Sequence, residues 1–303
     1  MTQKMVSTIA GITEKVQYTA HQRVIAIAAA EDEEVLAALK TVQEMGLAKA
    51  ICIGDEKKIR NIADRIGFDL AGVSVCHEPQ PAEAARRAVA KVKRGEADLV
   101  MKGLVGTGPF LQAVLAKEEG IRTGKILSHV SVFEAPLLSR LLVITDCAMN
   151  IAPTLQEKVQ LIKNAALVAK KLGALKPKVA VVCAVENVNE NMPSTLDAAV
   201  LAKMCERGQI PDVLVDGPLG LDQAVSLQSA RHKGIVTPLA GEADIILVPN
   251  LEAGNIMYKT LTYMSQTSHA GLVVGAQAPI VLTSRSDSAQ DKVNSIILGL
   301  ATM

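Results

Sequence analysis

Near the C-terminus, a hydroxyl and a guanidinium stand between an apolar run and a new helix. Residues 280–282 are typical of a buried strand, and Ser284 and Arg285 follow. Open α/β sheets bind ligands where strands end and helices begin, because free N–H groups and the helix dipole favour an anion there. Arg285 adds a cation suited to phosphate, and Asp291, seven residues after Ser284, could serve as a base. Hydroxyls and an aspartate in a first helical turn also cap helices, so this stretch alone favours capping.

A second candidate is the glycine-rich segment 103–108, which follows the cation of Lys102. Its glycines would let the backbone approach a ligand closely. The spacing G-x-x-G-x-G departs from the Rossmann pattern, and residues 120–126 fail the Walker A pattern. The sequence also contains no G-x-S-x-G elbow and no H-E-x-x-H motif, so it does not support a serine hydrolase or a zincin.

Further polar residues gather at other predicted strand ends. Ser128 with His129, Asp146 and Asn255 would lie along the edge where parallel strands end, and such edges line ligand clefts. Each also has a structural explanation, because His129 could be a hydrogen-bonded core residue and Asn255 a helix cap. Cys147 is more often a small core residue than a nucleophile, since no base is visible beside it.

The elements that must position these groups alternate between strands and helices. Apolar runs at 23–28, 48–53, 73–76 and 97–101 are separated by amphipathic helical segments, and a second alternation begins after residue 176. This second part is predicted to include helices over 221–231 and from 255 to about 265. Continuous apolar strands between helices indicate a parallel sheet that is covered on both faces. The sequence therefore predicts an α/β protein, doubly wound in its first half.

The composition is that of a globular protein. Of 303 residues, 49% are hydrophobic and 21% charged, and the net charge of +1 gives no field that would attract nucleic acid or an anionic membrane. Three Tyr, three Phe and no Trp leave no base-stacking platform. Five scattered cysteines predict neither a disulfide framework nor a zinc site. Without a signal sequence or an apolar run of ~20 residues, we expect a reduced, cytoplasmic protein.

Four ordered blocks resemble the phosphate acetyl/butyryltransferase family over essentially the whole chain. They are D-C-A-x-N-x-x-P-T at 146–154, D-G-x-x-x-x-D-x-A at 216–224, P-x-L-x-x-G-N-I at 249–256, and S-R at 284–285 with an aspartate at 291. The length and the segments 101–107, 120–124 and 127–130 favour the butyryl branch. The helix after the glycine loop reads Phe110-Leu111-Gln112 where the acetyl branch has a phosphate-binding arginine, and Arg122 or Lys102 is expected to replace it.

The resemblance implies a reversible reaction in which acyl-CoA and phosphate give acyl phosphate and CoA. It also implies two three-layer α/β/α domains with mainly parallel sheets, like those of isocitrate and isopropylmalate dehydrogenases, and an active site in the interdomain cleft. We expect domain I to comprise residues 1–135 and 283–303, and domain II residues 136–282. The protein is expected to form a homo-oligomer and to work with an acyl-phosphate kinase such as butyrate kinase.

The resemblance assigns three residues to catalysis. Arg285 would bind phosphate or stabilise the tetrahedral oxyanion, Ser284 would hydrogen-bond the developing charge, and Asp291 would move the proton of the CoA thiol. The acyl group would pass directly to phosphate in a ternary complex, since no activated Cys or Ser is evident. The chain would need no metal and no tightly bound cofactor, with coenzyme A and phosphate as substrates. The substrate-binding residues implied are Lys102, Gly103, Thr107, Arg122, Ser128, His129, Asp146, Cys147 and Asn255.

Other functions compete with this interpretation. A phosphate acetyltransferase would share the four blocks, and acyl chain length is not readable from the residues. A metal- and NAD-dependent decarboxylating dehydrogenase would share the architecture but needs clustered metal-binding aspartates, which the sequence does not show. A non-catalytic acyl-CoA sensor is the alternative from another class, and the intact Ser284, Arg285 and Asp291 argue against it.

Overall fold

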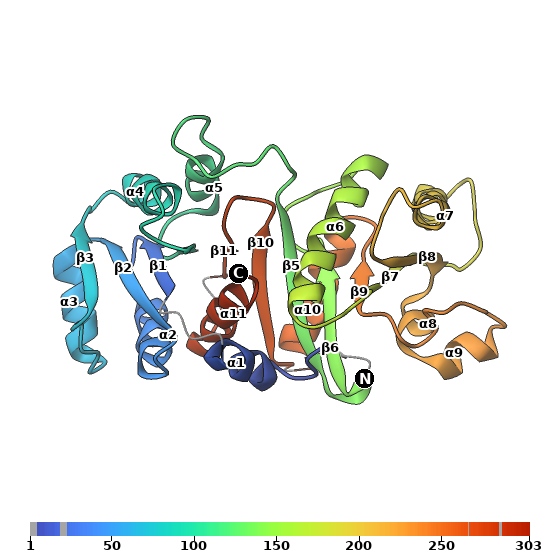
Figure 1. The fold of residues 1–303 in the computed structure, drawn as a ribbon, viewed down its shortest axis with the longest axis horizontal. Coiled ribbons are helices and arrows are strands. Elements are labelled where there is room, and N and C mark those ends of the chain that lie inside the picture. The colour runs from blue at the N-terminus through green and yellow to red at the C-terminus, as the bar shows by residue number, and fades with distance from the viewer. Residues whose placement is uncertain (1–4, 19–22, 266, 285–286) are drawn as a thin grey trace. The chain divides into compact units, whose positions relative to one another are not determined.

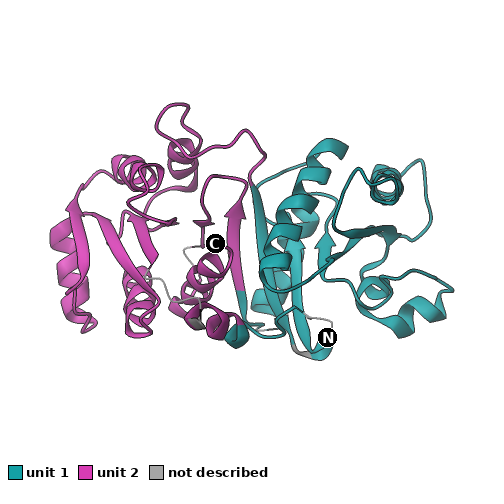
Figure 2. Cartoon of the chain, viewed as in Figure 1, with its two compact units in different colours: residues 1–11, 128–269 teal, residues 12–127, 270–303 magenta. Residues whose placement is uncertain are grey.

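The computed structural model describes residues 5–18, 23–265, 267–284 and 287–303. Arg285 therefore lies outside the described residues. The chain divides into two compact units, of which unit 1 comprises residues 1–11 and 128–269, and unit 2 comprises residues 12–127 and 270–303 (Figure 2). Helix α1 (Ile9–Tyr18) contains the boundary at residues 11 and 12. The domain limits expected above stay a prediction.

Unit 2 is built on a mainly parallel sheet with the strand order β3-β2-β1-β4-β11-β10 (Figure 1). Adjacent strands are parallel except for β10, which runs antiparallel to β11. Strands β1 and β4 are apolar along most of their length and buried, as expected for strands covered on both faces. The strands are β1 (Arg23–Ala28), β2 (Ala48–Gly54), β3 (Val73–His77), β4 (Leu99–Lys102), β10 (His269–Val274) and β11 (Ile280–Val281).

The helices of unit 2 fall into two groups. Helix α2 (Glu33–Glu44) packs against α3 (Glu56–Arg65) and α11 (Ala289–Ala301), whereas α4 (Pro81–Lys93) packs against α5 (Thr107–Leu115). Right-handed crossovers place α2 and α3 on one face of the sheet and α4 on the other, because the strand order reverses after β3. Each face is thus covered, and the carboxyl ends of β1, β2, β3 and β4 share one edge.

The described strands form one 11-stranded, mainly parallel sheet, and those of unit 1 have the order β5-β6-β9-β7-β8. Strands β5 and β6 form an antiparallel pair joined by a short 3₁₀ helix at Pro136–Leu138, whereas the pairs β6–β9, β9–β7 and β7–β8 are parallel. The strands are β5 (Ser128–Ala135), β6 (Arg140–Thr145), β7 (Lys178–Val182), β8 (Leu214–Leu219) and β9 (Ile245–Leu247).

Two layers of helices flank this sheet as well. Helix α6 (Leu155–Lys171) contacts α7 (Pro193–Glu206), and the returning connections carry α8 (Leu221–Val225), α9 (Leu227–His232) and α10 (Leu251–Tyr263). Phe133, Ile144, Cys147 and Ile246 form a buried cluster against which α8 and α10 pack. Within the described parts of the chain, every helix is too short or too polar to cross a membrane.

Differences from the predicted elements have local causes. The sequence predicts one helix over 221–231, whereas the structure has α8 and α9 separated by Ser226, whose backbone is extended. The Ser226 hydroxyl accepts a hydrogen bond from the Ser229 N–H at 3.2 Å and so begins a new helix. Helix α10 is predicted from residue 255, but it begins at Leu251 because Asn250 caps it.

Candidate functional site

In unit 2, β4 and β11 bring Lys102 and the terminal turn to the same sheet edge. The strands are parallel, with Ile280 beside Val100 and Val281 beside Met101. Continuing this register by one residue places Leu282 beside Lys102, and Ser284 follows two residues later. The Lys102 side chain is buried, with 5% of its surface exposed, and its ammonium donates to the carbonyls of Gly103 at 3.1 Å and Val105 at 3.4 Å.

The glycine loop is fixed closely against the end of β1. The Gly103 N–H donates to the Ala28 carbonyl at 2.8 Å, and the Leu104 N–H to the Ala29 carbonyl at 2.7 Å. A Cβ atom on Gly103 would lie 2.2 Å from the Ala29 carbonyl oxygen, so a glycine is required there. Helix α5 begins after this loop at Thr107, which is exposed.

The terminal turn is organised by Asp287, which the sequence analysis did not single out. The Ser284 N–H donates to its carboxylate at 2.7 Å, and the Asp287 N–H donates to the Ser284 carbonyl at 3.2 Å. The Lys292 side chain, 3% exposed, donates to the Asp287 carbonyl. Ser284 is exposed, so this part of the turn lies at the surface of the unit. The predicted role of Arg285 concerns a residue outside the described part of the chain.

Asp291 takes part in a capping box at the start of α11. Its carboxylate accepts from the Ser288 N–H at 3.1 Å and from the Ser288 hydroxyl at 2.6 Å, and its own N–H donates to that hydroxyl at 3.2 Å. This is the capping chemistry that the stretch alone favours. The same contacts fix the carboxylate seven residues after Ser284, on the first turn of α11.

Arg122 lies at the other end of β11. It forms an antiparallel bridge with Ala276, in the segment between β10 and β11, and the Gln277 N–H donates to the Ile121 carbonyl at 2.8 Å. The Thr123 hydroxyl donates to the Gly275 carbonyl at 2.5 Å, which is a further contact with the segment between β10 and β11. Arg122 is exposed, and its partner Ala276 lies before the start of β11. Ser284 lies after the end of β11.

In unit 1, Asp146 organises the loop that follows β6. Its buried carboxylate accepts hydrogen bonds from the N–H groups of Ala148 at 2.8 Å and Met149 at 2.9 Å through Oδ1. Oδ2 accepts from the His129 N–H at 3.1 Å and from the Asn150 side-chain amide at 2.6 Å. Both oxygens are engaged by the loop and by the start of β5, so Asp146 fixes the backbone of residues 146–150.

Helix α10 approaches this loop at Gly254 and Asn255. A Cβ on Gly254 would lie 2.3 Å from the Asp146 carbonyl oxygen and 2.9 Å from Val248 Cγ2, so the helix can approach this closely because of the glycine. The Asn255 side-chain amide donates to the Cys147 carbonyl at 3.2 Å, and the side chain is otherwise exposed. Asn255 is therefore a residue inside α10 and not its cap.

The remaining predicted residues of unit 1 are buried. Asn164 donates to the Ser128 hydroxyl at 2.9 Å, and the His129 ring lies 3.1 Å from the Ser131 hydroxyl. Burial raises the pKa of the Cys147 thiol to about 12, although a hydrogen bond with Ser131 acts in the opposite direction. The thiol is therefore protonated at neutral pH, and Cys147 lacks the reactivity of a nucleophile.

Asp287, Gly254 and Ser131 also shape the site, although they were not among the residues predicted for it. Asp287 lies three residues after Ser284 in the segment S-R-S-D-S. Ser and Asp are typical of turns, and this composition could have identified it. Gly254 is part of the block that includes Asn255, but its partner is the backbone of Asp146, far away in the sequence. Ser131 stands two residues after His129 on the same face of β5, which strand periodicity could have indicated.

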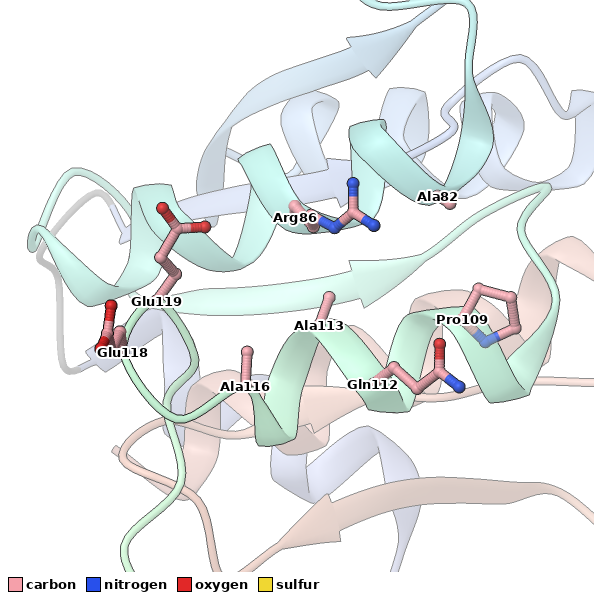
Figure 3. Close-up of a pocket in the computed structure, with 8 residues that line it drawn as sticks. All are labelled: Ala82, Arg86, Pro109, Gln112, Ala113, Ala116, Glu118 and Glu119. Carbon is pink, nitrogen blue, oxygen red and sulfur yellow. The ribbon is translucent and has the colours of Figure 1, made fainter.

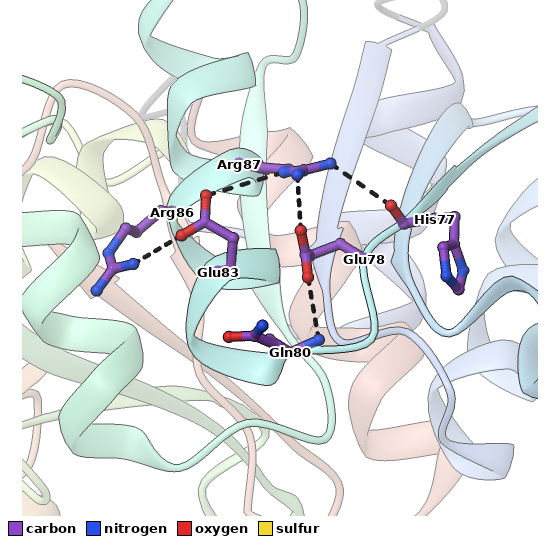
Figure 4. A network of polar contacts seen from close by, with 6 residues as sticks. All are labelled: His77, Glu78, Gln80, Glu83, Arg86 and Arg87. Atoms are coloured by element: carbon purple, nitrogen blue, oxygen red, sulfur yellow. Dashed lines mark hydrogen bonds and ion pairs between the residues drawn. The ribbon is translucent and has the colours of Figure 1, made fainter.

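A pocket of about 440 Å³ lies between α4 and α5 of unit 2, near the glycine loop (Figure 3). Arg86 extends from α4 toward the α5 side, where Pro109 and Gln112 contribute, and Glu118 and Glu119 line one end. Arg86 also pairs with Glu83 at 2.6 Å. Beside it, Arg87 pairs with Glu78 at 2.7 Å and donates to the His77 carbonyl, so that both arginines face carboxylates (Figure 4). Among the described residues, no three His, Cys, Asp or Glu side chains could hold a metal ion.

Comparison with known proteins gives one consistent family. The family model described as "Phosphate acetyl/butaryl transferase" matches residues 7–85 and 77–300. The chain is 52% identical over 274 residues to phosphate butyryltransferase from Clostridium acetobutylicum, covering 90% of this chain and 91% of that protein. It is 42% identical over 274 residues to phosphate acetyltransferase from Thermotoga maritima, covering 90% and 93%. The crystal structure of a branched-chain phosphotransacylase from Enterococcus faecalis V583 is similar with a TM-score of 0.84 and 32% identity, over 93% of this chain and 99% of that one.

Proposed function

The chain belongs to the phosphate acetyl/butyryl transferase family, and we propose that it transfers a butyryl group reversibly between coenzyme A and inorganic phosphate. The observation that carries this proposal is the 52% identity to the Clostridium acetobutylicum phosphate butyryltransferase over 90% of the chain. The lower identity of 42% to the Thermotoga maritima acetyltransferase favours butyryl over acetyl. The chain is an acyltransferase of a family whose substrates are acyl-CoA and phosphate.

The reaction joins a phosphate oxygen to the acyl carbon and breaks the bond between that carbon and the CoA sulfur. The proton of hydrogen phosphate ends on the released thiol, so atoms and charge balance. The enzyme must neutralise the phosphate, stabilise the oxyanion of the tetrahedral intermediate and move this proton. We assign these tasks to Arg285, Ser284 and Asp291 respectively, with Arg285 also close enough in sequence to share the oxyanion with Ser284.

The described part of the terminal turn supports this assignment. Ser284 is exposed at the carboxyl end of β11, and its backbone is fixed by Asp287. The capping box holds the Asp291 carboxylate on the first turn of α11, where a base would be preorganised. In the direction of acyl-CoA synthesis, Asp291 would take the thiol proton, and in the reverse direction it would return it.

The state of Cys147, which lies within the block at 146–154, supports direct transfer without an acyl-enzyme. The Cys147 thiol is buried, and its pKa of about 12 keeps it protonated. A protonated, buried thiol does not attack a thioester. We therefore propose that the acyl group passes to phosphate while both substrates are bound.

The other predicted residues fall into two roles. We propose that Gly103 in the glycine loop, Thr107 at the start of α5 and Asn255 inside α10 contact substrate, since Thr107 and Asn255 are exposed. Ser128, His129, Asp146 and Cys147 are buried, and the Asp146 carboxylate fixes the loop at 146–150, so we propose that these four residues shape the site from beneath its surface. We further propose that the enzyme is a cytoplasmic homo-oligomer without a tightly bound cofactor and that its acyl phosphate feeds a kinase such as butyrate kinase.

The test is CoA release from acetyl-, propionyl-, butyryl- and isobutyryl-CoA in the presence of phosphate, followed with a thiol reagent. We expect butyryl-CoA to give the highest kcat/KM, because each methylene in a fitted pocket is worth ~1–3 kcal/mol. A maximum with acetyl-CoA would instead make the chain a phosphate acetyltransferase. If none of the four thioesters released CoA, the proposed acyltransferase activity would be refuted. The alternative role as an acyl-CoA sensor would then gain support.

A further inference from the structure

A pocket of about 620 Å³ lies in unit 1, where three parallel strands begin. Arg140 is the first residue of β6, Lys178 is the first residue of β7, and Asp244 directly precedes β9. Because β6, β9 and β7 are parallel neighbours, these residues share the amino edge of the sheet. The loop at 146–150 follows the other end of β6, about 20 Å away at about 3.3 Å per extended residue.

Backbone contacts fix the walls of this pocket. The Lys178 N–H donates to the Asp244 carboxylate at 2.9 Å, and the Asp244 N–H donates to the Lys178 carbonyl at 2.9 Å. The Val143 N–H donates to the Asp244 carbonyl at 2.9 Å. The Val6 N–H donates to the Leu172 carbonyl at 2.9 Å, which holds the N-terminal segment beside the turn after α6. The pocket is therefore formed by ordered backbone from four parts of unit 1.

Arg140 lines this pocket with a charge that has no direct counter-charge. Its Nη2 donates to the Gly241 carbonyl at 2.9 Å, whereas its Nε is buried and has no hydrogen-bond partner within the described part of the chain. Among the described residues, no carboxylate forms an ion pair with Arg140, although Lys178 beside it pairs with Glu242. The Asp244 carboxylate lies in the field of Arg140 but bonds to the Lys178 backbone. An anion in the pocket would supply the missing counter-charge, and guanidinium groups bind carboxylates strongly.

The pocket lining combines charged and apolar groups. Arg140, Lys178 and the exposed Lys176 are cationic, and the acidic residues are Glu242 and Asp244. One positive charge remains, which a single anionic group neutralises. The apolar part of the lining consists of Met5, Leu138, Ala174 and Leu175. A monocarboxylate with a hydrocarbon chain matches both parts, whereas an inorganic ion has nothing to place against the apolar side chains.

We propose that this pocket binds an aliphatic monocarboxylate, with the carboxylate on Arg140 and Lys176 and the chain against the apolar lining. Its volume of about 620 Å³ is in the range of small-molecule sites, about 300–1,000 Å³. None of the residues assigned to catalysis or to substrate binding is among those that line it. The site is thus additional to the substrate site and does not rest on the proposed function.

Isothermal titration calorimetry with acetate, butyrate, hexanoate and octanoate at constant ionic strength tests the proposal. We expect one site per chain and a Kd that falls about two- to fourfold with each added methylene, because each methylene leaves water. Sulfate should bind at least about tenfold more weakly than octanoate. Saturating coenzyme A and phosphate should leave the Kd for octanoate within about twofold, and competition by them would overturn the proposal.

Three variants locate the bound carboxylate. Arg140→Gln keeps a donor for the Gly241 carbonyl but removes the charge, so the Kd for octanoate should rise at least about tenfold. Lys176→Gln changes an exposed side chain that the fold does not need, and the Kd should rise about two- to fivefold. Lys163→Gln removes the same charge from an exposed position of α6 outside the pocket and should leave the Kd within about twofold.

Four results would refute the proposal. Binding that Arg140→Gln and Lys176→Gln both left unchanged would place the carboxylate elsewhere on the protein. Equal affinity for acetate and octanoate would exclude a role of the apolar lining. If no carboxylate bound and Arg140→Gln changed the mass measured by analytical ultracentrifugation, the pocket would be a contact between copies of the chain. Absence of binding with an unchanged mass would show that the pocket takes no carboxylate at all.

Discussion

Substitution of Gly254 by alanine tests how closely helix α10 must approach the Asp146 loop. The added Cβ would lie 2.3 Å from the Asp146 carbonyl oxygen, about 1 Å short of van der Waals contact. The oxygen belongs to the backbone and cannot rotate away, so either α10 or the loop must move. That movement would lengthen the hydrogen bond from Asn255 to the Cys147 carbonyl, which is already 3.2 Å.

The expected cost follows from two opposing effects. Overpacking in a fitted interior costs ~1–3 kcal/mol, and the backbone clash puts this site at the upper end. Alanine in a helix recovers about 0.5–1 kcal/mol relative to glycine, so the net loss is about 2 kcal/mol. For a unit of this size that loss corresponds to a Tm about 4–8 °C lower.

Gly299 in α11 offers a matched control. A Cβ there would meet Leu272 Cδ2 and Leu99 Cδ1 at 3.5 Å, which is ordinary contact. Gly299→Ala should therefore raise the Tm by about 1–4 °C through helix propensity alone. Thermal unfolding followed by circular dichroism measures both variants, together with kcat for butyryl-CoA, which should fall in Gly254→Ala alone. An unchanged or higher Tm in Gly254→Ala would refute the reasoning about close approach.

Two further predictions concern the assigned residues. Cys147→Ala should keep kcat within about threefold, and mass spectrometry of the wild-type enzyme with butyryl-CoA should find no acylated cysteine, because the thiol pKa of about 12 keeps Cys147 protonated; a trapped Cys147 thioester would contradict direct transfer. Asp291→Asn should lower kcat by about 10²–10⁴-fold, as expected for loss of a base, whereas Ser288→Ala should cost about 1 kcal/mol of unfolding free energy and leave kcat within about tenfold. Equal losses of kcat in the two variants would reduce Asp291 to its capping role.

Much of the fold could be predicted from the sequence because its strands are continuous apolar runs. The expected strands at 23–28 and 48–53 agree with β1 and β2 to within a residue, since burial on both faces leaves no polar alternation that could mislead. The helix predicted over 221–231 was wrong, because Ser226 offers its hydroxyl to the Ser229 N–H and competes with the helix. The break between α8 and α9 is therefore set by local capping at Ser226, which hydrophobic periodicity does not predict.

The candidate site was predictable as a set of strand ends but not as a set of contacts. Asp146 was recognised through its block, yet its four partners include the His129 N–H, which comes from the neighbouring antiparallel strand among the described residues. Lys102 and Arg122 looked equivalent as cations near glycines, and only the pairing of β4 with β11 separates them. Strand order is set by tertiary packing and cannot be predicted from the local sequence.

The glycines of the site show why such contacts escape sequence reasoning. Gly103 and Gly254 lie in a loop and in a helix, and each permits an approach to a carbonyl oxygen from a different strand end, that of Ala29 or of Asp146. A glycine next to a helix start is usually explained by the turn it permits, because its distant partner is not visible in the sequence. Each contact positions an element that carries a residue predicted to bind substrate. This residue is Lys102 next to Gly103 and Asn255 next to Gly254. The glycines therefore act on function through distance, by setting how near the loop and the helix can come to the strand ends that support them.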